Sequence, residues 1–246
     1  MKAVILAAGY ATRLYPLTLN TPKPLLKVGC KTIMDHLFEK LREIPAIDMV
    51  YIVTNDRFYT HFADWARDNP PCKPATIIND GTSSEDTRLG AIGDLRLVIE
   101  KEGIKDDIMV MAGDNLMDFS LKDFYDYHRR VNGSCVCLQK IKSPEALKRM
   151  GVVLMDEKNR IVSFEEKPEN PISDIGASAI YIYRREALPL IGGYLAAGGN
   201  PDAPGYLIEW LYRHEDIYGY LYNGSCYDIG TPEAYKRIQE IYPCRD

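Results

Sequence analysis

Residues 1–14 read MKAVILAAGYATRL, and this stretch decides the fold class of the chain. Residues 3–7 form an uninterrupted apolar run, which is typical of a strand that is buried on both faces. Gly9 follows at once and allows the backbone of the next segment to come close to a ligand. Arg13 places a permanently charged guanidinium in the same segment. The stretch therefore predicts a buried strand that leads directly into a binding loop.

The same alternation of strand and helix continues through the first half of the chain. Further apolar runs predict buried strands at 49–53, 75–78 and 108–112. Segments with apolar residues at helical spacing lie between and after them, at 32–43, 58–67, 82–99 and 120–131. The third of these helices is expected to open with the capping-box pattern of Thr82 and Glu85. Alternating strands and helices of this kind predict an α/β fold with a mainly parallel, Rossmann-like sheet covered on both faces.

The second half of the chain is richer in strands. Strand-like runs lie at 134–141, 151–154, 160–164 and 179–183, with less helix between them. The sheet is therefore expected to be open and mixed. Neither a repeat nor a Pro/Ser-rich linker divides the sequence. We predict a single domain over residues 1–246, with one part at 1–132 and a second at 133–246.

Composition excludes several classes of protein. The formal net charge of -5 argues against a protein that coats nucleic acid. No apolar stretch reaches the roughly 20 residues of a membrane helix, and the N-terminus lacks the pattern of a signal peptide, so a cytoplasmic protein without membrane contact is expected. The 6 cysteines are dispersed without paired metal-ligand spacing. They are expected to be reduced, and no zinc site is expected.

Two basic side chains in the first loop region indicate phosphate binding. Arg13 offers a planar fork that suits phosphate oxygens, and Lys23 lies between Pro22 and Pro24, which stiffen its backbone. Ligands of open parallel sheets bind at the carboxyl ends of the strands, where this loop begins. The spacing of a P-loop, GxxxxGK[ST], is missing, and so is the GxGxxG of dinucleotide-binding oxidoreductases. The loop is therefore predicted to bind phosphate by neither of these motifs.

Two aspartates are candidates for a metal site. Asp114 follows the buried strand at 108–112, and Asp228 precedes Thr231 and Pro232, which form a good N-cap and first turn for a last helix. Magnesium takes one or two carboxylates and completes its shell with phosphates and water. Each aspartate could equally be a turn residue, and the sequence does not establish that the two meet. Glu166 and Lys167 could form a surface ion pair or bind a phosphorylated ligand.

Together these segments resemble the signature of the sugar-1-phosphate nucleotidyltransferases, in particular the branch of the glucose-1-phosphate thymidylyl- and uridylyltransferases. The resemblance covers nearly the whole chain, and its motifs occur in the family's order. The matching segments are 6–9, 12–14, 16–18, 22–26, 113–115, 165–168 and 228–233.

The resemblance implies a magnesium-dependent reaction of a nucleoside triphosphate, UTP or dTTP being favoured, with a sugar 1-phosphate. Residues 1–132 would bind the nucleotide and residues 133–246 the sugar phosphate, in a possible homodimer. Catalytic roles are implied for Arg13, Lys23 and Asp114. Nucleotide contacts are implied for Ala8, Gly9, Thr12, Arg13, Lys23, Asn79 and Leu89, sugar-phosphate contacts for Glu166 and Lys167, and Mg²⁺ ligation for Asp114 and Asp228.

The chain departs from the family pattern at two places. Ala11 stands where relatives carry a second glycine, and Arg88 lies in the base-reading segment at a position where we expect glycine. The second departure keeps open a CTP-dependent cytidylyltransferase that acts on a sugar or alcohol phosphate. A catalytically silent subunit that senses nucleotides or sugar phosphates is the alternative from another class. Such a subunit would not need both Asp114 and Asp228, and their presence argues against it.

Overall fold

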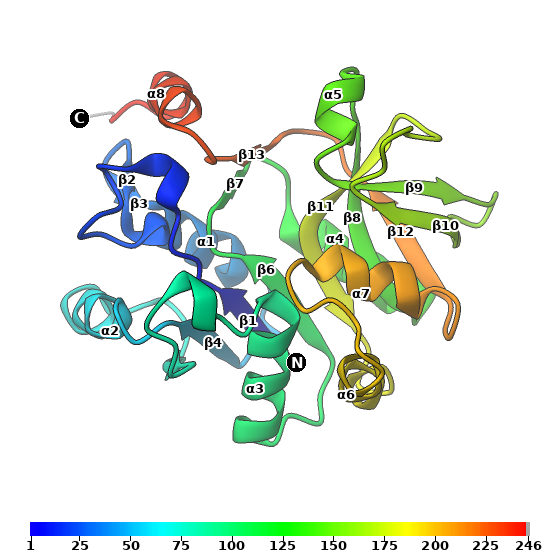
Figure 1. Cartoon of the computed structure of the whole chain (residues 1–246), viewed down its shortest axis with the longest axis horizontal. Coiled ribbons are helices and arrows are strands. Elements are labelled where there is room, and N and C mark those ends of the chain that lie inside the picture. The colour runs from blue at the N-terminus through cyan, green and yellow to red at the C-terminus, as the bar shows by residue number, and fades with distance from the viewer. Residues whose placement is uncertain (245–246) are drawn as a thin grey trace.

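The computed structural model describes residues 1–244, and Figure 1 shows the arrangement of its elements. The helices are α1 (Ile33–Arg42), α2 (Tyr59–Asp68), α3 (Ala91–Glu102), α4 (Leu121–Val131), α5 (Pro144–Leu147), α6 (Leu188–Ala196), α7 (Pro204–Leu211) and α8 (Pro232–Ile241), with 3₁₀ turns η1 (Thr12–Leu14), η2 (Lys23–Leu25) and η3 (Glu85–Thr87). The strands are β1 (Lys2–Leu6), β2 (Lys27–Val28), β3 (Lys31–Thr32), β4 (Met49–Thr54), β5 (Ala75–Asn79), β6 (Ile108–Ala112), β7 (Asn115–Met117), β8 (Ser134–Lys140), β9 (Gly151–Met155), β10 (Ile161–Glu166), β11 (Ile175–Tyr183), β12 (Ile217–Leu221) and β13 (Cys226–Asp228).

One mixed sheet of nine strands runs through both halves of the chain. Its main path is β10-β9-β11-β6-β1-β4-β5, and β8 joins it by pairing with β11 and β12. The strands β5, β4, β1 and β6 are parallel, whereas β11 runs antiparallel to β6. Chain order reverses between β1 and β6, because β1 leads outward to β4 and β5 before the chain returns to β6. This is the switch point at which sheets of this class bind ligands.

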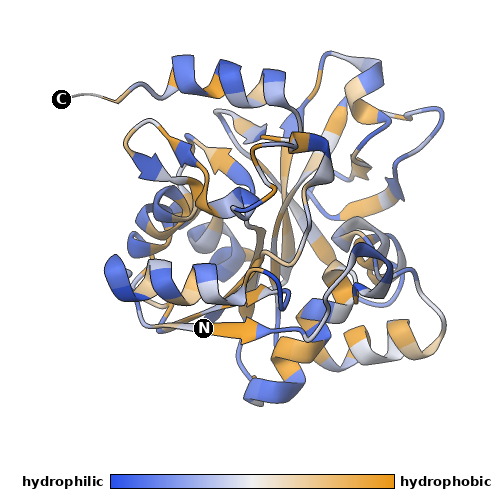
Figure 2. Cartoon of the chain, turned by 60° about the vertical axis from the view of Figure 1, so that its left-hand side comes forward, coloured by the Kyte–Doolittle hydropathy of each residue, from blue (hydrophilic) through white to orange (hydrophobic). Residues whose placement is uncertain are grey.

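Helices cover both faces of the sheet, as the unbroken apolar strands predicted. On one face α1, α2 and α4 bury their apolar sides against β1, β4 and β6. On the other face α3, α6 and α7 do the same. Figure 2 shows the mostly hydrophobic strands near the centre and both hydrophobic and hydrophilic residues on most helices. The prediction of an α/β, Rossmann-like fold is confirmed.

Side-chain caps open several of the predicted helices, among them the cap at Thr231 that the sequence predicted. Thr32 closes a reciprocal capping box with Asp35 at the start of α1. Ser120 caps α4, and Thr231 caps α8 with Pro232 in its first turn. Among residues 1–244, no helix is long and apolar enough to cross a membrane.

The predicted start of the third helix was wrong. Ser84, not Thr82, forms a capping box, with Thr87, and it opens only the short turn η3. The helix α3 begins at Ala91, after Gly90 with φ 77°. The amide of Ile92 donates to the carbonyl of Pro201, so a loop from the second half of the chain satisfies the helix end. No local signal predicts a cap that comes from so far along the sequence.

The expectation that every cysteine is reduced was also wrong. The structure pairs Cys30 with Cys244, whose Cα atoms lie 4.9 Å apart. Helix α8 causes this approach, because it packs on the β2–β3 hairpin through Ile238 and through hydrogen bonds to Lys27. The remaining cysteines, Cys72, Cys135, Cys137 and Cys226, are free.

Candidate active site

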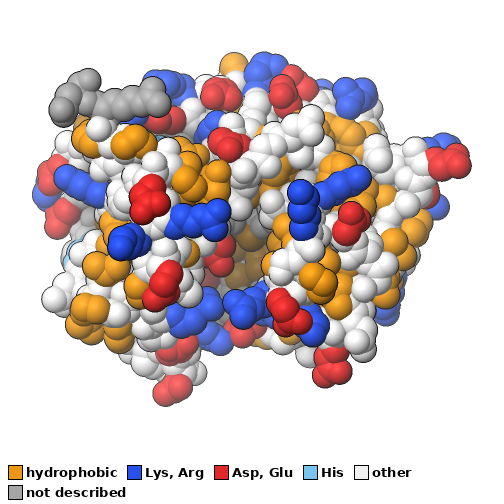
Figure 3. All heavy atoms as spheres, turned by 90° about the horizontal axis from the view of Figure 1, so that it is seen from above, with side chains coloured by type: hydrophobic (Ala, Val, Ile, Leu, Met, Phe, Trp, Pro, Cys, Tyr) orange, Lys and Arg blue, Asp and Glu red, His pale blue; other side chains and the backbone are white. Residues whose placement is uncertain are grey.

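A cavity of about 350 Å³ opens at the carboxyl ends of β1 and β6. Figure 3 shows the molecular surface hollowed between its two sides, with Lys and Arg side chains on the rim of the hollow. The loop after β1 and the segment before α3 line the cavity from the first half of the chain, and Ala179, Asp202, Pro204 and Gly230 line it from the second. Its size falls in the range of small-molecule sites.

The loop after β1 is held in place by buried polar contacts. Asn55, fully buried at the end of β4, donates its side-chain amide to the carbonyl of Ala8 at 2.8 Å. The hydroxyl of Thr18 donates to the carbonyl of Ala11 at 2.8 Å. Ala11 has φ 47°, the left-handed region that favours glycine, which explains why a second glycine suits this position. No pattern in the sequence predicted this role of Asn55.

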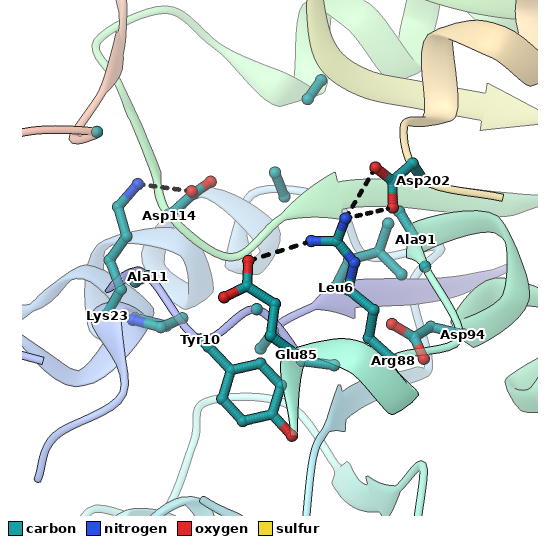
Figure 4. Close-up of a pocket in the computed structure, with 18 of the residues that line it drawn as sticks. Leu6, Tyr10, Ala11, Lys23, Glu85, Arg88, Ala91, Asp94, Asp114 and Asp202 are labelled. Atoms are coloured by element: carbon teal, nitrogen blue, oxygen red, sulfur yellow. Dashed lines mark hydrogen bonds and ion pairs between the residues drawn. The ribbon is translucent and has the colours of Figure 1, made fainter. Parts of the chain in front are cut away.

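Lys23 joins the two predicted metal ligands. Its ammonium group donates to Asp114 Oδ2 at 2.6 Å and to Asp228 Oδ1 at 3.2 Å. The lysine is only 6% exposed, whereas the Asp228 side chain is 69% exposed. Figure 4 shows Lys23 and Asp114 pointing toward one another in the cavity. The two carboxylates therefore lie close enough to share one positive charge. A divalent cation held by two carboxylates needs the same approach.

The sheet topology explains this convergence. Gly113 lies against β1, and a Cβ at this position would stand 3.0 Å from the carbonyl oxygen of Leu6. Because glycine has no side chain, the chain can make this approach and turn toward the loop that carries Lys23. Strand β13 pairs antiparallel with β7 and places Asp228 opposite Asn115, next to Asp114. Among residues 1–244, no three metal-binding side chains cluster. A two-carboxylate site fits magnesium, whose shell substrate phosphates and water would complete.

The structure brings together part of the predicted residue set. Ala8, Gly9, Thr12, Arg13, Lys23 and Asp114 line the cavity, and Asp228 reaches it through Lys23. Asn79 and Leu89 do not line it. The side-chain amide of Asn79 donates to Asp56 and its side-chain oxygen accepts from the amide of Gly81, so it shapes the turn after β5, and Leu89 is exposed.

Glu166 and Lys167 lie beside the cavity and not in its lining. The Glu166 carboxylate is inserted between Gly151 and Gly205, where a Cβ on either residue would approach it to 3.1 Å and 1.8 Å. Gly205 directly follows Pro204, which lines the cavity. Burial, helped by the charge of Glu209, raises the pKa of Glu166 to about 7, while Lys167 opposes this rise. Both residues remain predictions as sugar-phosphate contacts.

The far end of the cavity carries residues that sequence reasoning did not assign. Arg88 reaches across to Asp202 at 2.9 Å and lies 3.6 Å from Glu85. Asp94, in the first turn of α3, also lines the cavity and is 5% exposed. Gly90, not residue 88, is the glycine that opens the helix. Figure 4 shows Arg88, Asp94 and Asp202 on the opposite side of the view from Lys23 and Asp114.

Comparison with known proteins identifies the family of the chain. A family model described as nucleotidyl transferase matches residues 2–243. The chain is 30% identical to a putative mannose-1-phosphate guanyltransferase of Sulfolobus acidocaldarius over 97% of this chain and 62% of that protein. It is 28% identical to the bifunctional protein GlmU of Methanocaldococcus jannaschii over 94% of this chain and 52% of that protein. The chain thus spans between half and two thirds of these relatives' lengths.

Solved structures share the fold. A putative glucose-1-phosphate thymidylyltransferase from Bacillus anthracis aligns with a TM-score of 0.78 at 24% identity, covering 100% of this chain and 96% of that one. A UDP-glucose pyrophosphorylase complexed with UDP-glucose aligns with a TM-score of 0.81 at 20% identity, covering 98% and 97%. The match of the family model to residues 2–243 confirms the resemblance found in the sequence. The chain belongs to the nucleotidyl transferase family, as do the sugar-1-phosphate nucleotidyltransferases that its motifs resemble.

Proposed function

We propose that this protein transfers a nucleotidyl group from a nucleoside triphosphate to a sugar 1-phosphate and releases pyrophosphate. The observation that carries the proposal is the position of Lys23, whose ammonium group lies between Asp114 and Asp228 at the mouth of the phosphate-binding loop. A positive charge and two carboxylates at one point suit the handling of a metal-bound triphosphate. The curated relatives named above, a guanyltransferase among them, support the same reaction class.

The reaction needs positioning and charge neutralisation more than proton transfer. An oxygen of the sugar 1-phosphate attacks the α-phosphorus, the bond from that phosphorus to the bridging oxygen of the β-phosphate breaks, and pyrophosphate leaves with the electron pair. A phosphate monoester has its second pKa at about 6 and is already largely a dianion at neutral pH, so no general base is required. Consistent with this, the cavity lining in residues 1–244 contains no histidine.

Each charged residue that the sequence predicted for the site has a place in this scheme. Arg13 has no ion-pair partner among residues 1–244, so its guanidinium is available for the triphosphate. Lys23 would offset the charge that develops on the leaving pyrophosphate. Asp114 and Asp228 would hold Mg²⁺, which when bound draws negative charge from the α-phosphate. Glu166 and Lys167 would bind the sugar hydroxyls and the acceptor phosphate from the neighbouring side.

We further propose that UTP or dTTP and a hexose 1-phosphate are the substrates. The test is pyrophosphate release in the presence of Mg²⁺, with each of ATP, CTP, GTP, UTP and dTTP against glucose, mannose and N-acetylglucosamine 1-phosphates, inositol phosphate and phosphocholine. Turnover with UTP or dTTP and a hexose 1-phosphate is expected. Turnover with CTP alone would replace this assignment by the cytidylyltransferase. Nucleotide binding without any turnover would indicate a sensing subunit.

A further inference from the structure

The two ends of the cavity differ in charge. Arg13 and Lys23 stand at the loop end together with the predicted metal ligands Asp114 and Asp228, whereas the acids Glu85, Asp94 and Asp202 line the α3 end with Arg88 as their basic partner. With Mg²⁺ on the two aspartates, as in the proposed function, the loop end attracts a triphosphate, whereas at the α3 end the ionised acids Glu85 and Asp202 outnumber Arg88. A bound nucleotide therefore has its phosphates at Arg13 and Lys23, and its base is directed toward α3.

Most polar groups at the α3 end already have partners. The amides of Ala91 and Ile92 donate to the carbonyls of Asp202 and Pro201 at 3.4 Å and 2.9 Å. Arg88 is occupied by Asp202 and Glu85. Asp94 is the exception, because its Oδ1 is buried and has no hydrogen-bond partner among residues 1–244. A buried polar atom without a partner has lost its contact with water and gained nothing in return, so a ligand that supplied a hydrogen bond would gain affinity.

The chemistry of Asp94 depends on a second acid, Asp80. Asp80 accepts hydrogen bonds from the amide and the hydroxyl of Thr82 at 2.7 Å and 2.9 Å, which favour its ionised form. Burial, with the charge of Asp80 and a hydrogen bond to it, raises the pKa of Asp94 to about 8. Two carboxyls in contact share one proton, and here Asp94 holds it and donates it to Asp80. The unpartnered Oδ1 of Asp94 can accept a hydrogen bond from a ligand whether or not the other oxygen carries that proton.

We propose that Asp94 reads the nucleotide base by accepting a hydrogen bond from a ring N–H group, which selects uracil, thymine or guanine over cytosine and adenine. Uracil and thymine carry this group at N3 and guanine at N1. Cytosine and adenine present an unprotonated ring nitrogen at the corresponding edge, which would face the acceptor oxygen of Asp94 without a proton between them. The assignment of Asp94 rests on the proposed function and narrows its nucleotide.

The test is nucleotide binding in the presence of Mg²⁺ and without an acceptor, measured by calorimetry. The probes are UTP and N3-methyl-UTP, GTP and N1-methyl-GTP, and CTP and ATP. The unmodified protein should bind the better of UTP and GTP about 10-fold more tightly than its methylated analogue, the size of one hydrogen bond to a buried acceptor. Tightest binding of CTP or ATP would overturn the proposal.

Variants separate recognition from a structural role. Asp94→Ala should bind the preferred nucleotide about 10-fold more weakly and no longer distinguish it from the methylated analogue. Asp94→Asn should stay within about twofold of the unmodified protein, because its amide can donate to Asp80 while its oxygen still accepts. Asp86→Ala, on the exposed side of η3, is the matched control and should change neither value. An Asp94→Ala protein that still discriminates against the analogue contradicts the proposal.

A second variant covers the case in which Asp94→Ala does not fold. Asp80→Asn replaces the acid that accepts the shared proton by a donor, so Asp94 should ionise and bind the ring N–H several-fold more tightly, with no gain for the methylated analogue. Equal losses for both nucleotides would show that the pair only supports the fold. Selective nucleotide binding without turnover would leave Asp94 its role and refute the transferase. Turnover by an enzyme that binds the methylated and unmethylated nucleotides equally well would support the transferase and refute the role of Asp94.

Discussion

Lys23 illustrates how one side chain serves two charge states of the site. In the structure its ammonium group is bound to Asp114 and Asp228, and it is nearly excluded from solvent. Under the proposed function, an entering cation would give the carboxylates another positive partner, and the lysine would become available to the phosphates of the nucleotide. Removal of the lysine leaves the carboxylates without their partner and the leaving group without a counter-charge.

Lys23→Met, which keeps the length of the side chain without its charge, should lower the rate of pyrophosphate release at least about 100-fold, because a preorganised charge at the leaving group is lost. Steady-state assays with saturating nucleotide and sugar phosphate measure this effect. Lys27→Met is the matched control, since Lys27 is exposed on β2 nearby and should keep full activity. A Lys23→Met enzyme with normal turnover would remove Lys23 from the mechanism.

The raised pKa of Glu166 predicts that the stability of the protein depends on pH. Its pKa rises from 4.5 to about 7 in the folded protein, chiefly by burial. Between these values the unfolded chain ionises while the folded protein retains the proton, so Glu166 lowers the free energy of unfolding progressively as pH rises. Above about pH 7 the loss is constant, at roughly 3 kcal/mol.

Glu166→Gln should therefore be no more stable than the unmodified protein at about pH 4, and more stable by roughly 2–3 kcal/mol at about pH 8. Urea unfolding at both pH values measures this difference. Glu165→Gln, at the neighbouring exposed position of β10, should show no such divergence. If Glu166 binds the sugar hydroxyls, the same variant should also raise the KM for the acceptor.

At the scale of elements, the start of α3 depends on a loop from the other side of the cavity. Gly90 has φ 77° and lies so close to the loop 198–203 that a Cβ would stand 2.5 Å from the carbonyl oxygen of Pro201. The hydrogen bond from Ile92 to the same carbonyl needs this approach. The helix that presents Asp94 is thus positioned by contact with the second half of the chain.

Gly90→Ala should lower the free energy of unfolding by roughly 2 kcal/mol or more and raise the KM for the nucleotide, because both the backbone angle and the contact with Pro201 resist a side chain. Gly81→Ala is a matched control, since Gly81 has the same φ of 77° and no atom lies within 4 Å of the position that its Cβ would take. Its cost should be limited to about 1 kcal/mol for the backbone angle. If urea unfolding gave the same loss of unfolding free energy for Gly90→Ala and Gly81→Ala, the contact with Pro201 would not contribute to stability.

At the scale of the whole molecule, the cysteine pair links the β2–β3 hairpin to the segment after α8. Cys30 and Cys244 are 214 residues apart in sequence, so their disulfide closes almost the whole chain into one loop. A cross-link over so long a loop restricts the unfolded chain strongly. It also secures α8, which follows directly on Asp228 and the loop at Gly230.

Cys244→Ser should lower the free energy of unfolding by roughly 2–5 kcal/mol under non-reducing conditions. Urea unfolding measures the change, and mass spectrometry of the unmodified protein establishes that the pair is oxidised. Cys72→Ser, which removes an exposed free thiol, is the control and should have little effect. Identical unfolding curves of the Cys244→Ser and unmodified proteins, with the pair shown to be oxidised, contradict a stabilising role.

The sequence by itself determined what depends on neighbours along the chain. Unbroken apolar runs predicted β1, β4 and β6, because a strand buried on both faces needs apolar residues at every position. Thr231 with Pro232 predicted the start of the last helix, since a cap bonds to an amide only a few residues away. Residue chemistry and the preceding strand predicted a binding loop with Arg13 and Lys23, and the structure places both residues in the lining of the cavity.

Only the tertiary structure decided what depends on contacts across the sheet. The meeting of Asp114 and Asp228 follows from the pairing of β7 with β13, and the register of two distant strands cannot be read from either strand alone. The start of α3 was misjudged because its cap comes from Pro201, and the pairing of Cys30 with Cys244 because α8 folds back on a hairpin. Asp94 reads as an ordinary helix residue in the sequence, and only burial beside Asp80 gives it a chemical role.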